Sequence, residues 1–169
     1  MTASRAAAAP GARRPTPGSV FAFIAALSFV CVGAALVSQH VYGMEPCAWC
    51  VLQRLVFLAI GVVALVGLAW RGAAAGRAVG AAVLLLALAG LASAIWQHFV
   101  AARSASCAMT LADRIVSSTT LDTVLPDVFS ARANCAEAAV NLLGVPYAFW
   151  SAAVFLVVIA AALRVLRRH

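Results

Sequence analysis

Four long apolar stretches constrain this chain more than any other feature of its sequence. They run over Val20 to Val37, Val51 to Trp70, Ala78 to Val100 and Leu142 to Leu163, and among them only the second carries a residue that is charged at all pH values, Arg54. A helix rises about 1.5 Å per residue, so it needs roughly 20 apolar residues to cross about 30 Å of hydrocarbon. Each stretch therefore reaches or approaches the length of a transmembrane helix.

The composition agrees, because 65% of the residues are hydrophobic and only 10% are charged, against about 25% charged in ordinary soluble domains. We predict an all-α membrane protein, a four transmembrane helix bundle forming a single domain over residues 1–169. The predicted segments are a cytoplasmic tail (1–17), helices at about 18–38, 51–70, 78–100 and 142–163, and periplasmic loops at about 39–50 and 101–144.

The arginines predict the orientation of these helices. The net charge is +7, but the basic residues are not gathered with aromatic residues into a domain that would bind nucleic acid. They precede the first helix, lie between the second and third helices and follow the fourth, and the other two connections are poorer in positive charge. By the positive-inside rule, both termini are cytoplasmic and both longer loops lie outside. The first apolar stretch is longer than that of a cleavable signal peptide, so we expect it to remain as a helix. The flanking arginines are Arg5, Arg13, Arg14, Arg71, Arg77, Arg164, Arg167 and Arg168.

Five cysteines are divided by this topology. Cys31 falls in the middle of the first helix, where a thiol usually serves as a small packing residue. Cys47 and Cys50 lie at the first outer loop, and Cys107 and Cys135 lie in the second. Four cysteines therefore face the side on which disulfides persist.

The Cys47-Ala48-Trp49-Cys50 pair has the spacing of labile redox disulfides. Cys50 stands at the amino end of the second helix, where free N–H groups and the helix dipole favour a thiolate. Haem attachment would require a histidine at position 51, which is Val51. A zinc site of the four outer cysteines and a pair of purely structural disulfides stay open as alternatives.

Arg54 follows Cys50 by four positions, so the two side chains share one face of a helix. A charge inside a membrane segment indicates function by default, although Arg54 could simply extend to the lipid head groups. The functional interpretation is that Arg54 stabilises the Cys50 thiolate and a carbonyl oxygen of a bound electron acceptor.

The remaining outer residues carry weaker signals. His98 ends the third helix and is either an interfacial residue or a site residue. Trp49, Trp96 and Trp150 fit the aromatic belt at a membrane surface. An apolar set in the second loop, interrupted by Pro126, predicts a short helix on the membrane surface. This set is Leu111, Ile115, Leu121, Val124, Leu125, Val128 and Phe129.

These motifs resemble the disulfide bond formation protein B (DsbB) family. The run from Pro46 to Arg54 is similar to the family signature PCxxCxxxR, and the stretch from Leu121 to Glu137 resembles the family's second periplasmic loop. Helix number, charge topology and cysteine order agree as well. The resemblance implies a bacterial inner-membrane thiol oxidase, multi-pass, with no metal cofactor.

The resemblance also implies a route for electrons. Cys107 would form a mixed disulfide with DsbA, the soluble periplasmic dithiol oxidase. Cys135, once released, would exchange with Cys47, and the freed Cys50 would donate to a quinone, ubiquinone or menaquinone, beside Arg54. DsbA is a strong oxidant at about −120 mV, so its reoxidation needs a strong acceptor such as a quinone. His98 would be a further quinone contact.

The chain departs from the best-known members of the family at Gln53, where they have an acid, and in a shorter interval between His98 and Cys107. Two competing functions remain. A vitamin K epoxide reductase-like enzyme would carry its redox CxxC on the last helix, and the fourth helix here has no cysteine. A membrane scaffold with structural disulfides would not turn over quinone.

Overall fold

The computed structural model describes residues 16–70, 72–103 and 109–168 and consists mainly of four long helices. These are α1 (Pro17–Tyr42), α2 (Ala48–Ala69), α3 (Ala73–Phe99) and α7 (Tyr147–Leu166). All four are long and apolar enough to cross a membrane. The predicted fold class, an all-α bundle of four membrane-spanning helices, is therefore confirmed.

The first helix continues beyond its predicted end. The Thr16 side chain accepts a hydrogen bond from the Ser19 N–H at 3.2 Å and caps α1. At the other end the helix stops at Gly43, whose φ of 65° is left-handed and favours glycine. The first loop is therefore confined to residues 43–47, and Gln39, placed in the loop by the prediction, is buried on α1.

The fourth helix begins at Tyr147 rather than at Leu142. A small hairpin precedes it, in which β1 (Asn141–Leu142) pairs antiparallel with β2 (Val145–Pro146). The turn between the strands contains Leu143 and Gly144 with φ of 54° and 80°. Hydropathy alone did not reveal this turn, because its residues are apolar like those of the helix.

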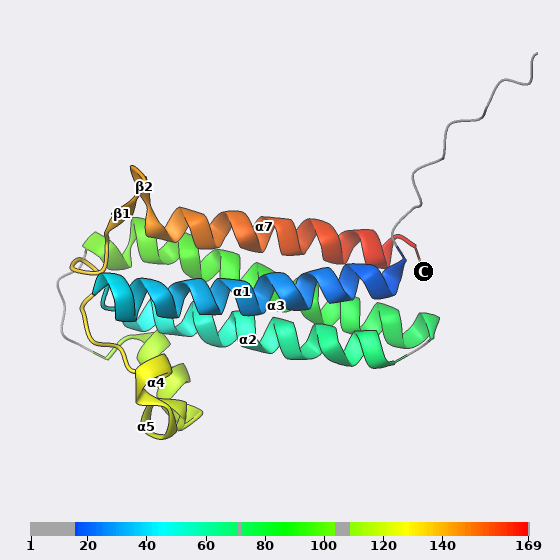
Figure 1. Ribbon diagram of the computed structural model, residues 1–169, viewed down its shortest axis with the longest axis horizontal. Helices are drawn as coiled ribbons and strands as arrows, with labels where there is room; N and C mark the ends of the chain where they lie inside the picture. Colours follow the sequence, from blue (N-terminus) through cyan, green and yellow to red (C-terminus); the bar gives the residue numbers. More distant parts are fainter. Residues whose placement is uncertain (1–15, 71, 104–108, 169) are drawn as a thin grey trace, which may run out of the picture.

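The helices lie side by side with both longer loops at one end of the bundle and the two ends of the described chain at the other (Figure 1). In the core, the rings of Phe57 from α2 and Phe155 from α7 stack in parallel, with centroids 4.2 Å apart. Gly90 of α3 lies against Phe155. Because glycine has no Cβ, the Phe155 ring can occupy the space beside it. Close packing of α3 on α7 and of α2 on both α1 and α3 positions the end that carries the cysteines.

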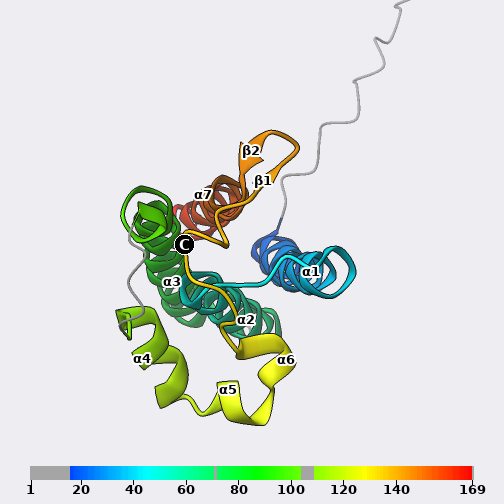
Figure 2. The same cartoon turned by 90° about the vertical axis from the view of Figure 1, so that its left-hand side faces the viewer.

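The second loop folds into short helices rather than one. After the 3₁₀ turn η1 (Ala101–Arg103) come α4 (Leu111–Ser118), α5 (Leu121–Val124) and α6 (Pro126–Phe129), which lie beside the bundle (Figure 2). Two residues interrupt the helical pattern: Thr120, whose φ of 56° is left-handed, and Pro126. Ala112, Val116 and Phe129 are buried, whereas Leu111, Ile115, Val124 and Leu125 are exposed. Contact of these exposed side chains with a membrane surface stays a prediction.

Candidate active site

Three thiols meet at the amino end of α2. Cys47 is the N-cap residue of that helix and is fully buried. Its sulfur lies 3.2 Å from the sulfur of Cys50, one helical turn away. The Cys47 side chain also forms a hydrogen bond with Cys135 of the second loop. All three are free thiols. Because Cys47 contacts both Cys50 and Cys135, it lies between the two other sulfurs.

Local hydrogen bonds bring Cys135 to this position. The carbonyl of Pro46 accepts a hydrogen bond from the Arg132 N–H at 2.9 Å, which joins the second loop to the start of the CxxC pair. Beside Cys135, the Asn134 side chain accepts from the Glu137 N–H at 2.9 Å, and the Glu137 carboxylate accepts from the Asn134 N–H at 3.1 Å. These reciprocal bonds form a tight turn that presents the Cys135 sulfur to Cys47.

The hydrogen bonds among these thiols shift the pKa values of Cys47 and Cys135 in opposite directions. Hydrogen bonds with Cys135 and Cys50, together with burial, raise the pKa of the Cys47 thiol. The hydrogen bond from Cys47 lowers the pKa of the Cys135 thiol. Cys47 is therefore the proton donor of the cluster, and Cys135 is favoured as a thiolate, which is the nucleophilic form in thiol–disulfide exchange.

Two glutamines extend the cluster from Cys50 into the contact between α2 and α3. The Gln97 Nε2 donates to the Cys50 sulfur at 3.0 Å. The Gln53 Nε2 in turn donates to the Gln97 Oε1 at 2.6 Å. Both amides are buried, with 4% of each residue exposed. A thiolate can only accept hydrogen bonds, so the Gln97 amide presents the group that such a sulfur requires.

The Arg54 guanidinium is buried and turned inward, with 6% of the residue exposed. Its NH1 donates to the Gln39 Oε1 at 2.6 Å and to the Val128 carbonyl at 3.1 Å, and its NH2 donates to the Ala35 carbonyl at 3.3 Å. These partners are all neutral, and no carboxylate of the described ranges forms a salt bridge with Arg54. The cation therefore favours negative charge nearby, and Cys50 is one of the groups on which its field acts.

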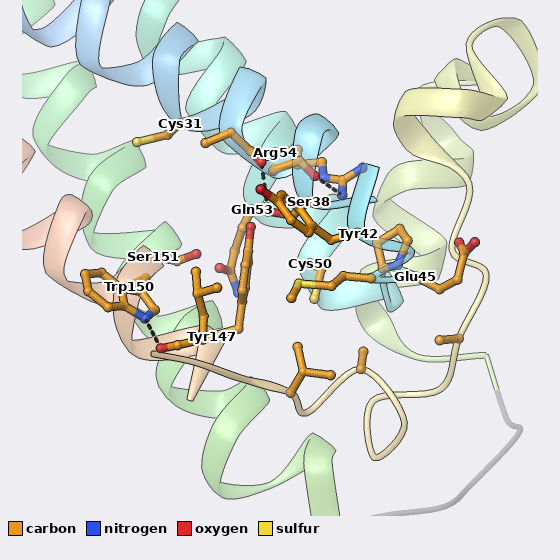
Figure 3. Close-up of a pocket in the computed structure, with 18 of the residues that line it drawn as sticks. Cys31, Ser38, Tyr42, Glu45, Cys50, Gln53, Arg54, Tyr147, Trp150 and Ser151 are labelled. Carbon is orange, nitrogen blue, oxygen red and sulfur yellow. Dashed lines mark hydrogen bonds between the residues drawn. The ribbon is translucent and has the colours of Figure 1, made fainter. Parts of the chain in front are cut away.

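A cavity of about 880 Å³ adjoins these groups. Cys50, Gln53 and Arg54 of α2 line it together with Tyr147 and Trp150 of α7 (Figure 3). Most of the other lining residues belong to α1 and to the two loops, so the cavity extends between α1 and α7 near the loop end of the bundle. Besides those named, the lining residues of α1 include Cys31, Val32, Ala34, Ala35 and Ser38.

The other predicted site residues lie in different settings. Cys107 is outside the described residues. The His98 ring packs against Phe99 and Phe149, with centroids 4.9 and 4.5 Å away, and His98 is not among the residues that line the cavity. Its role as a quinone contact stays a prediction. Cys31 packs against the core and also borders the cavity.

Sequence reasoning missed Gln39 and Gln97 as parts of the site. Each is an amide next to a histidine in a largely apolar helix, close to the end that carries the cysteines, and that short polar stretch was the available signal. Trp49 also differs from the prediction, because it is buried and packs against Trp96 with ring centroids 6.3 Å apart instead of lying in an exposed aromatic belt.

Comparison with known proteins bears directly on this arrangement. The family model described as disulfide bond formation protein DsbB matches residues 17–165. The chain belongs to the DsbB family. The disulfide bond formation protein B of Azoarcus sp. (strain BH72) is 36% identical over 148 residues, which cover 85% of this chain and 86% of that protein. Its counterpart in Aromatoleum aromaticum is 37% identical over 124 residues, covering 71% and 74% of the two chains.

Membership of the DsbB family carries an oxidoreductase role in disulfide bond formation, a periplasmic thiol partner and a membrane context. The four apolar helices are those of a multi-pass membrane protein, and DsbB family members are inner-membrane proteins. Within residues 16–70, 72–103 and 109–168, no group of three or more His, Cys, Asp or Glu side chains could hold a metal ion.

Proposed function

We propose that this protein reoxidises a DsbA-like periplasmic dithiol oxidase and transfers the electrons to a membrane quinone, so that disulfide formation in periplasmic proteins continues. One observation carries the proposal. Cys47 contacts the sulfurs of both Cys135 and Cys50, and Cys50 borders a cavity that also contains the Arg54 guanidinium. The Cys50 sulfur thus takes part in thiol exchange and also borders the proposed acceptor site.

The proposed exchange steps combine the contacts of Cys47 with the entry role that the family resemblance implies for Cys107. A thiolate of the partner attacks Cys107 of a Cys107–Cys135 disulfide and releases Cys135 as a thiolate. Cys135 then attacks Cys47 of the Cys47–Cys50 disulfide, and Cys50 leaves as a thiolate. Each step breaks one S–S bond and forms another, so no external oxidant is consumed. The contact of Cys135 with Cys47 supports its role as the attacking sulfur.

The residues of the cavity fit a quinone. Its volume of about 880 Å³ lies within the roughly 300–1,000 Å³ of small-molecule sites, and its lining is largely apolar. A bound quinone would supply a two-electron acceptor that becomes a quinol with two protons. Arg54, which has no acidic hydrogen-bond partner among the described residues, would hold a quinone oxygen and stabilise negative charge there. Ubiquinone and menaquinone both meet these requirements.

The orientation belongs to the same proposal. Both loops lie at one end of the bundle and the described chain ends lie at the other (Figure 1). With the arginine-flanked ends in the cytoplasm, the cysteine loops face the periplasm, where a DsbA-like partner is found. Cytoplasmic termini and periplasmic redox loops are therefore the topology that the proposed reaction requires.

Reconstitution tests this function. We expect the purified full chain to oxidise a reduced DsbA-like oxidase over many turnovers only when ubiquinone or menaquinone is added, with one quinone consumed per partner disulfide formed in those turnovers. Without quinone, oxidation of the partner should stop once the protein's own disulfides are used. Quinone absorbance and the thiol content of the partner are the measurements. The absence of quinone reduction, or sustained partner oxidation without quinone, would overturn the proposal.

The Cys135→Ser variant, mixed with the oxidised partner, tests the order of the steps. We expect its free Cys107 thiolate to attack the partner disulfide and form a mixed disulfide that accumulates, because Cys135, the sulfur that would break this bond, is missing. Peptide mapping of the trapped adduct locates the linkage. An adduct through Cys47 or Cys50 would show that the second loop is not the entry point.

A further inference from the structure

The Cys50 sulfur lies in an environment that the exchange chemistry alone does not explain. Cys47 is bonded to it on one side, and on the other the Gln97 Nε2 donates a hydrogen bond across the contact between α2 and α3. Cys50 is the sulfur that leaves in the second exchange step. Negative charge therefore develops on the atom that Gln97 contacts.

Gln97 is itself held in one orientation. Its Oε1 accepts a hydrogen bond of 2.6 Å from the Gln53 Nε2, so the opposite end of the amide, its NH₂ group, faces the sulfur. If the Gln97 amide were turned over, its oxygen would face the Cys50 thiolate, and its NH₂ group would face the NH₂ group of Gln53. The hydrogen bond from the buried Gln53 thus fixes the donor orientation of Gln97.

We propose that Gln97 is a catalytic residue of this reaction, which donates a hydrogen bond to Cys50 when that sulfur leaves as a thiolate, and that Gln53 is its positioning residue. The inference rests on the proposed function, in which Cys50 is the leaving sulfur. A neutral amide donor suits this place. It stabilises the anion without forming an ion pair, and so leaves the Arg54 charge available to the cavity.

An uncharged amide at position 53 suits the same pair. A carboxylate there has no N–H to donate, so it could not hold the Gln97 Oε1 as the Gln53 amide does. With glutamine at positions 53 and 97, the Gln53 NH₂ group donates to the Gln97 Oε1, and the Gln97 NH₂ group donates to the Cys50 sulfur. Gln53 and Cys50 both line the cavity (Figure 3). The hydrogen bonds of Gln97 to each of them connect Gln53 to the state of the sulfur.

The test measures Cys50 in the reduced, quinone-free protein. Gln97→Met keeps the size of the side chain but removes the donor. A hydrogen bond to a charged group is worth about a ten- to hundredfold change in the equilibrium that it stabilises. A more basic sulfur is also a better nucleophile, which offsets part of this loss. We expect iodoacetamide to alkylate Cys50 about three- to tenfold more slowly in the variant at neutral pH, as read by peptide mass spectrometry.

Ser93→Ala is the matched control. Ser93 is buried one turn before Gln97 on α3, and its hydroxyl donates only to the Gly90 carbonyl of its own helix. In the Ser93→Ala variant, the rate at which Cys50 is alkylated should equal that of the wild type. Gln53→Met should slow alkylation less than Gln97→Met, because the Gln97 amide is then free to turn. Should Gln97→Met fail to fold, the Gln53 variant decides.

An unchanged Cys50 rate in folded Gln97→Met, or in Gln53→Met if that variant alone folds, would overturn the inference. The outcome is separable from that of the proposed function. Wild-type protein that reduces quinone while Gln97→Met keeps its alkylation rate refutes the glutamine role alone. A slowed rate in protein that never reduces quinone refutes the function and leaves the hydrogen bond to Cys50 established.

Discussion

At the scale of single residues, Arg54 separates two hypotheses for a charge inside an apolar helix. A side chain that only extends to lipid head groups needs no fixed partners. Arg54 instead donates to Gln39, Ala35 and Val128, which belong to α1 and the second loop. Three of its five N–H groups have partners within the described chain, so the planar guanidinium is held in place with capacity for a ligand.

Arg54→Lys should therefore impair the quinone reaction selectively. Lysine keeps the charge but cannot reproduce the planar fork, and loss of a charge-assisted contact costs about 1.5 to 3 kcal/mol. At roughly 1.4 kcal/mol per tenfold, we expect a rise of about 10- to 100-fold in the apparent KM for quinone. Thiol exchange between Cys107 and the partner should be nearly unchanged. Steady-state kinetics with varied quinone measures both.

Gln39→Met serves as the comparison variant for Arg54. It removes the shortest hydrogen bond of the guanidinium, at 2.6 Å, but leaves the cation and its two carbonyl partners. Its effect on the quinone dependence should be smaller than that of Arg54→Lys. If both variants show the wild-type quinone dependence, Arg54 has no role in binding the acceptor.

At the scale of secondary-structure elements, the site depends on how closely the helices approach. Gly90 permits the approach of α3 to α7, because a Cβ added there would overlap the Phe155 ring. Phe155 in turn stacks on Phe57 of α2. This contact aligns α2 and α3, the two helices that carry Cys50 and Gln97. A change in the middle of the bundle therefore reaches the thiol end through rigid helices.

Gly90→Ala should destabilise the bundle by about 1 to 3 kcal/mol through overpacking. Gly33→Ala is a matched control on α1, since nothing lies within 4 Å of its added Cβ. There, the better helix propensity of alanine should leave stability unchanged or raise it by up to about 1 kcal/mol. Thermal unfolding in detergent measures both. Equal midpoints in the two variants would contradict the close approach at Gly90.

At the scale of the whole molecule, the bundle has two chemically different ends. One end holds the thiols of Cys47, Cys50 and Cys135, the hairpin and the short helices of the second loop (Figure 2). The other holds the connection between α2 and α3 and the end of α7, where Arg164, Arg167 and Arg168 gather. A membrane protein with such an asymmetry can couple a soluble thiol on one side to a carrier dissolved in the bilayer.

Labelling from outside the cell membrane tests the orientation. Ser118 of α4 and Arg167 after α7 are exposed and lie at opposite ends of the bundle. We expect a thiol reagent that cannot cross membranes to label Ser118→Cys in intact spheroplasts and Arg167→Cys only after lysis. Peptide mapping distinguishes these positions from the native cysteines. The opposite pattern would reverse the topology.

Much of this protein is determined by local sequence. Apolar length sets the number of spanning helices, because a segment either can or cannot cross the hydrocarbon. The spacing of Cys50 and Arg54 places both on one face of a helix, since helical periodicity depends on the chain alone. The structure has both residues on α2, and the family comparison agrees with the resemblance drawn from the cysteine motif.

Tertiary structure decided what those residues contact. The bonds of Cys47 to Cys135, of Cys50 to Gln97 and of Arg54 to Gln39 each join elements far apart in the chain. Neither spacing nor hydropathy encodes such pairs. They arise because packing excludes water, so a buried amide, thiol or guanidinium must find its partner on whichever helix or loop the fold places beside it.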